Sequence, residues 1–133
     1  MAAKTLSALV AVALAACASA AASGHVQQRF FLSPSGNISC EMDLFSATNR
    51  TAYCQTFSPP ASASVFPDGH VEECFGVTDQ CLGNPPDGVR RLAYGASLAL
   101  GPFRCSSLPS GVRCVVTESQ HGFLISRAGI SHF

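Results

Sequence analysis

Residues 37–57 read NISCEMDLFSATNRTAYCQTF and contain two runs in which apolar and polar residues alternate. The first run covers Asn37 to Asp43 and the second covers Arg50 to Phe57, with a polar bend between them. Alternation of this kind is typical of a strand with one buried and one exposed face. Folding the chain at the bend places Cys54 opposite Cys40 on the same face. The stretch therefore predicts an antiparallel hairpin closed by a Cys40–Cys54 disulfide.

Residues 103–116, FRCSSLPSGVRCVV, predict a second hairpin nearer the C-terminus. Pro109 at the second and Gly111 at the fourth position of the turn LPSG fit a type I turn. Cys105 before the turn then faces Cys114 after it, or lies one register step away if Gly111 forms a bulge. In either register the geometry favours a Cys105–Cys114 disulfide.

The segment between the hairpins, residues 58–88, is predicted to be irregular because it has little periodicity and five of the chain's eight prolines. Such a long irregular segment is uncommon in a compact domain and needs a cross-link. Cys74 and Cys81 lie inside it, and by elimination they are expected to bond to each other. Short strands are expected elsewhere, at Arg29–Leu32, Arg91–Tyr94, Ser97–Leu100 and Gly122–Ser126.

The N-terminus has the pattern of a secretory signal, with one positive charge at Lys4 before an apolar run from Leu6 to Ala16. This run is shorter than the roughly 20 apolar residues of a membrane span. The order Leu-Ala-Ala-Cys at residues 14–17 resembles the lipobox of bacterial lipoproteins. We therefore expect a signal peptide over residues 1–16 and a lipid on Cys17. The alternative is ordinary cleavage after Ala20, which gives a freely secreted chain.

The rest of the chain has the composition of one small exported domain. Residues 17–28 read as a flexible tether, because they are rich in small residues, and residues 29–133 as one β domain. Six cysteines in so short an exported chain indicate a disulfide framework, and they are Cys40, Cys54, Cys74, Cys81, Cys105 and Cys114. The seven arginines beyond Lys4 form no cluster, so nucleic-acid binding is not expected. Membrane attachment is expected only through Cys17.

With these motifs in view, the chain resembles a family of small secreted proteins and lipoproteins of unknown function from actinobacteria, including mycobacteria. The resemblance rests on the motif SPSGNIxC at residues 33–40 and the motif HGFxxSR at residues 121–127. It also rests on Phe31 before the first motif and, between the two motifs, on Tyr94, Gly95, Gly101, Phe103, Cys105, Ser107, Gly111, Val112 and Cys114. Residues 58–87 depart from the family pattern. The resemblance implies an exported location and a similar fold, and it provides no catalytic residue to carry over.

The residue types suggest two kinds of site, that of a hydrolase and that of a zinc protein. A hydrolase would use His121 with a nucleophile such as Ser126, but the two are separated along an extended strand by roughly 16 Å, and no Gly-x-Ser-x-Gly motif occurs. A zinc site could use His70, Cys74, Cys81 and His121, but zinc requires reduced thiolates, which six exported cysteines are not expected to supply. We therefore predict no catalytic residue, no metal site and no cofactor.

These observations predict a mainly β, disulfide-stapled antiparallel domain, sandwich-like or barrel-like, that follows a signal peptide. The expected function is a non-catalytic binding or envelope-associated protein, located outside the cytoplasm and attached to the cell membrane by a lipid on Cys17. Its expected partner is a protein or a component of the cell envelope, because loops on a rigid scaffold commonly form binding sites. The alternative is a small secreted hydrolase that uses His121.

Overall fold

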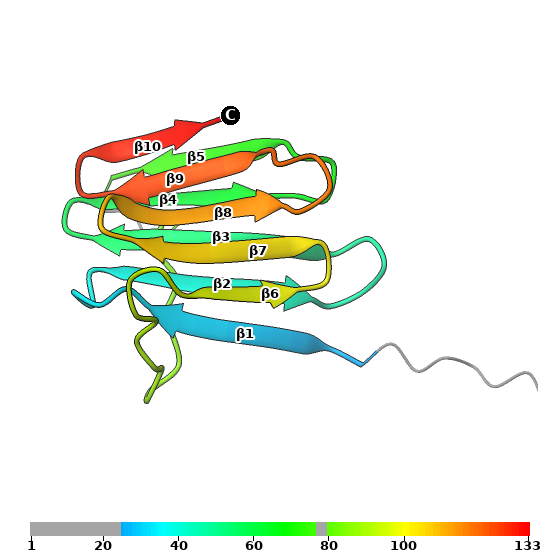
Figure 1. Ribbon diagram of the computed structural model, residues 1–133, viewed down its shortest axis with the longest axis horizontal. Helices are drawn as coiled ribbons and strands as arrows, with labels where there is room; N and C mark the ends of the chain where they lie inside the picture. The colour runs from blue at the N-terminus through cyan, green and yellow to red at the C-terminus, as the bar shows by residue number, and fades with distance from the viewer. Residues whose placement is uncertain (1–24, 77–79) are drawn as a thin grey trace, which may run out of the picture.

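The computed structural model describes residues 25–76 and 80–133, and within them ten strands form two five-stranded antiparallel sheets (Figure 1). The first sheet contains β1 (Gln27–Leu32), β2 (Ile38–Leu44), β3 (Arg50–Phe57), β4 (Pro60–Val65) and β5 (Val71–Phe75). The second contains β6 (Ser97–Leu100), β7 (Phe103–Leu108), β8 (Gly111–Val116), β9 (Gly122–Ser126) and β10 (Gly129–His132). The predicted fold class is confirmed. Cys17 and the predicted signal peptide lie outside the described residues.

Each sheet is a meander, in which every strand pairs with the next strand along the chain. The two sheets lie face to face, with β3 and β4 against β8 and β9. The inward side chains form one core that contains Phe31, Met42, Val65, Phe103, Val112, Phe123 and Ile125. Along a strand, core residues are spaced two positions apart. This spacing favours strand formation, because it places every second side chain in the core.

The three predicted disulfides are present, joining Cys40 to Cys54, Cys74 to Cys81 and Cys105 to Cys114. Cys105 is directly opposite Cys114 in the β7–β8 register, so the bulged alternative does not occur. Cys40 is likewise opposite Cys54 in the β2–β3 register. The sulfur atoms of Cys54 and Cys114 lie 3.5 Å apart, so two of the disulfides touch in the middle of the core.

The prediction that residues 58–88 are irregular is wrong, because they contain β4 and β5. Strand β4 alternates Ala61, Ala63 and Val65 with serines, and alanine gives only a weak hydrophobic signal. Its proline, Pro60, is the first residue of the strand, where proline is tolerated. Strand β10 is a third strand that the sequence does not predict. The strand expected at Arg91–Tyr94 is reduced to one isolated bridge between Leu32 and Arg91.

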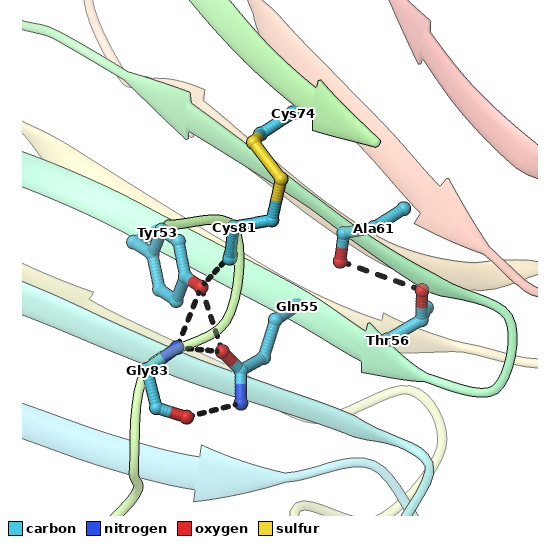
Figure 2. Close-up of a disulfide and its surroundings, with 7 residues drawn as sticks. All are labelled: Tyr53, Gln55, Thr56, Ala61, Cys74, Cys81 and Gly83. Carbon is cyan, nitrogen blue, oxygen red and sulfur yellow. Dashed lines mark hydrogen bonds between the residues drawn. A yellow bond between two sulfur atoms is a disulfide. The ribbon is translucent and has the colours of Figure 1, made fainter. Parts of the chain in front are cut away.

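The segment after Cys81 crosses the outer face of the first sheet, and we call residues 81–91 the strap. Figure 2 shows its first part against β3, next to the Cys74–Cys81 disulfide. The Gly83 N–H donates to Gln55 Oε1 at 2.6 Å, and the Gln55 amide donates to the Gly83 carbonyl oxygen at 2.9 Å. The strap explains why Ser39 is buried on the face that the sequence predicts to be exposed.

The strap ends at strand β1. The Leu32 N–H donates to the Arg90 carbonyl oxygen at 3.0 Å, and the Leu92 N–H donates to the Leu32 carbonyl oxygen at 2.8 Å. Arg91 also donates from Nη1 to the carbonyl oxygen of Pro34, in the turn between β1 and β2. The strap is therefore fixed at both ends, by a disulfide at β5 and by hydrogen bonds at β1.

Candidate functional site

One end of the sandwich, at the left in Figure 1, brings together the β1–β2, β7–β8 and β9–β10 turns. These turns and Tyr94 enclose a cavity of about 360 Å³, which we call the turn cavity. Pockets for small molecules have volumes of roughly 300–1,000 Å³, so the turn cavity is at the small end of that range. Its apolar part includes Ile38, Leu108 and Pro109.

The β1–β2 turn forms a rigid wall of the turn cavity. Ser33 Oγ accepts a hydrogen bond from the Ile38 N–H at 3.1 Å, and Ser35 Oγ accepts one from the Asn37 N–H at 3.2 Å. The Asn37 side chain pairs with Ser58, because its Nδ2 donates to the Ser58 carbonyl oxygen and its Oδ1 accepts from the Ser58 N–H. The side chains of this motif therefore hold the turn in place.

Three other side chains of the turn cavity have no partner within the described residues: Tyr94, Ser110 and Arg127. Tyr94 is 56% exposed, although a large aromatic side chain is normally more buried. The residues that line the cavity include no aspartate, glutamate or lysine, and Arg127 is the one charged residue among them. The turn cavity thus offers hydroxyl groups, an aromatic ring and one cation to a ligand.

A second group of polar residues lies on the outer face of the first sheet, where Glu41 is opposite Tyr53. Burial, together with the nearby Asp43 carboxylate, raises the pKa of Glu41 from 4.5 to about 7. Burial also raises the pKa of Tyr53. Asp43 accepts a hydrogen bond from Gln28 Nε2 at 2.8 Å. A raised carboxyl pKa is one mark of an acid–base catalyst.

The space beside Glu41 is small, which indicates that these polar residues help to pack the strap against the first sheet. It has a volume of only about 10 Å³ between β2, β3 and strap residues 83–85, about enough for one water molecule. No substrate fits there. The unfolded chain releases the Glu41 proton at lower pH than the folded chain does. The contribution of Glu41 to stability therefore falls as the pH rises from 4.5 to about 7.

The residues considered for a hydrolase are kept apart. His121 precedes β9, whereas Ser126 is the last residue of β9 and lines the turn cavity. His121 Nδ1 lies 3.2 Å from the carbonyl oxygen of Phe133, and the His121 side chain packs against Gly69. Ser126 Oγ accepts a hydrogen bond from the Ala128 N–H at 3.1 Å.

The residues considered for zinc have other partners. Cys74 and Cys81 are bonded to each other and so offer no thiolate. His70 Nδ1 lies 2.5 Å from Asp68 Oδ1, and this hydrogen bond raises the pKa of His70 and lowers that of Asp68. Among the described residues, the sulfur atoms of Cys40, Cys54 and Cys114 are the one group close enough together to ligate a metal, and all three belong to disulfides.

Comparison of the chain with protein-family models, with curated proteins and with solved structures finds no match. Within residues 25–76 and 80–133, no helix has the length and hydropathy of a membrane span.

The turn cavity brings together residues from separate sequence motifs. Ser33 to Ile38 come from the first motif, Ser126 and Arg127 from the last, and Tyr94 and Gly111 from the blocks between them. The sequence alone does not predict Tyr94, Ser110 or Arg127 as binding residues. The shared Pro-Ser-Gly at residues 34–36 and 109–111, which marks two turns that both reach the cavity, could have pointed to Ser110 but not to Tyr94 or Arg127.

Proposed function

We propose that the protein is an exported, lipid-anchored and non-catalytic binding protein, which holds part of a cell-envelope component in the turn cavity. The observation that carries this proposal is the cavity itself, where Tyr94, Ser110 and Arg127 surround a space of about 360 Å³ without internal partners. Exposed polar groups on turns of a rigid β scaffold are a common form of binding site. Kinship with the small exported proteins of actinobacteria is part of the same proposal.

The position of the cavity fits a membrane anchor. Three disulfides are compatible with a location outside the cytoplasm, where they persist. Strand β1 begins at Gln27, nearest to the proposed anchor at Cys17, and ends at Leu32, directly before the turn that lines the cavity. The start of β1 and the cavity are thus at opposite ends of a strand of roughly 20 Å.

Binding in the turn cavity is tested with the Cys17→Ala chain, exported and purified, and solubilised polysaccharide from actinobacterial envelopes. We expect NMR chemical-shift changes at residues 33–38, 94, 108–111 and 126–128. The Ser110→Trp variant should abolish binding, because an indole ring at this exposed turn fills the cavity. The matched variant Ser119→Trp, in the β8–β9 turn at the other end of the sandwich, should bind normally. Shift changes that map to another face, or no changes, would contradict the proposed function.

Lipidation is tested by the Cys17→Ala substitution in the full chain. We expect the wild-type chain to partition with membranes and to incorporate a radiolabelled fatty acid, and the variant to lose both properties. The variant should still be exported, because cleavage after Ala20 remains available. A wild-type chain that is soluble and unlabelled would show that the protein is secreted freely.

A further inference from the structure

We infer that the ligand of the turn cavity is an acidic sugar, bound through its anionic group by Arg127 and through its ring by Tyr94. This inference rests on the proposed function, because it names the class of ligand for the same cavity. It follows from three properties of the wall: the sign of its charge, its aromatic surface and the kind of polar group that it presents.

The charge of the wall favours an anion. Arg127 lies in the β9–β10 turn, is exposed, and makes no hydrogen bond or ion pair within the described residues. The residues that line the cavity include no carboxylate to neutralise it. A guanidinium group binds a carboxylate or a phosphate through two parallel hydrogen bonds, which is the strongest polar contact that this wall can offer.

The aromatic surface and the hydroxyl groups favour a sugar. Tyr94 is 56% exposed beside the cavity, so its ring can cover the apolar face of a flat ligand. Ser110 presents a free hydroxyl, which both donates and accepts hydrogen bonds. A sugar ring has apolar C–H faces and a rim of hydroxyl groups, and it therefore matches both features. A neutral, wholly apolar ligand would leave Arg127 and Ser110 without partners.

Two other arginines, Arg91 and Arg113, have partners within the chain, and a third, Arg104, lies away from the turn cavity. Arg91 donates to the Pro34 carbonyl oxygen, and its guanidinium group packs on Gly36 in the β1–β2 turn. Arg113, on the outer face of the second sheet, lies 4.7 Å from the centre of the Phe133 ring. Arg104 lies on the same outer face, is exposed and does not line the turn cavity. Arg104 is therefore a suitable control for a loss of positive charge.

The test uses NMR titration of the exported Cys17→Ala chain with D-glucuronate, D-glucose 6-phosphate, neutral D-glucose and N-acetyl-alanyl-alanine at millimolar concentrations. We expect at least one of the two acidic sugars to bind at the turn cavity at least about tenfold more tightly than glucose. Comparison of D-glucuronate with D-glucose 6-phosphate shows whether the anionic group is a carboxylate or a phosphate. Arg127→Gln should remove this preference, and Arg127→Lys should keep part of it. Arg104→Gln should leave it unchanged. Tyr94→Leu should weaken binding of every sugar.

The results separate this inference from the proposed function. Glucose binding as tightly as the acidic sugars, or an unchanged preference in Arg127→Gln, would overturn the acidic-sugar assignment. Binding of the peptide without binding of either acidic sugar would also overturn it, in favour of a peptide carboxylate. If no small probe binds but envelope polysaccharide still shifts the cavity residues, the assignment fails and the proposed function stands. If neither the probes nor the polysaccharide bind, both fail.

Discussion

Replacing Phe123 by alanine should lower the free energy of unfolding by about 3 to 5 kcal/mol. Phe123 lies on β9 opposite Cys114, and its side chain is 0% exposed. Its ring is among the largest side chains of the shared core, so the substitution removes apolar contacts and leaves a cavity between the sheets. Denaturant unfolding followed by circular dichroism measures the change.

The matched control for this prediction is Phe45→Ala. Phe45 is 43% exposed in the loop between β2 and β3, so its loss should change stability by less than about 1 kcal/mol. A loss of that small size in Phe123→Ala would mean that β9 does not face the core. The register of the second sheet would then be shifted by one residue.

Removing the Cys40–Cys54 disulfide by the double substitution Cys40→Ala and Cys54→Ala should cost about 2 to 5 kcal/mol. The bond joins residues 14 apart in the sequence, so it restricts the unfolded chain. Both cysteines are also buried in the core, and alanine leaves unfilled space there. Urea unfolding under non-reducing conditions measures the loss.

The Cys74→Ala and Cys81→Ala double variant is the comparison. Its disulfide joins residues only 7 apart and fastens the strap, so a smaller loss of stability is expected. Equal losses would indicate that position in the core contributes little. Peptide mapping without reduction provides an independent check, because a peptide joining Cys40 to any cysteine other than Cys54 would contradict the β2–β3 register.

The sequence was most informative where two signals agree. For the β2–β3 hairpin, alternation and the two cysteines predict the same register, and the structure has Cys40 opposite Cys54. For β7–β8, the turn residues and the cysteines agree in the same way. Where the core side chains are small, as at Ala61 and Ala63 of β4, alternation carries little hydrophobic contrast and the strand was missed.

The candidate site was harder to predict than the strands. The turn cavity needs turns from both sheets at one end of the molecule, and sequence patterns do not show which turns share an end until the order of all ten strands is known. One strand omitted from a meander reverses the direction of every later strand. The sequence prediction has one strand, at Arg91–Tyr94, between β3 and β6, where the structure has two, so it could not place Arg127 beside the β1–β2 turn.

The arrangement of the disulfides has a consequence for how the two layers are joined. Two of the bonds lie between residues 40 and 81 and the third lies between residues 105 and 114, so none of the three connects the first half of the chain to the second. The backbone of the strap and of the residues that follow it, up to β6, is the covalent connection between the two sheets. A protease that cuts between residues 82 and 96 would produce two fragments, the first with two internal disulfides and the second with one. In denaturant these fragments would separate without a reducing agent.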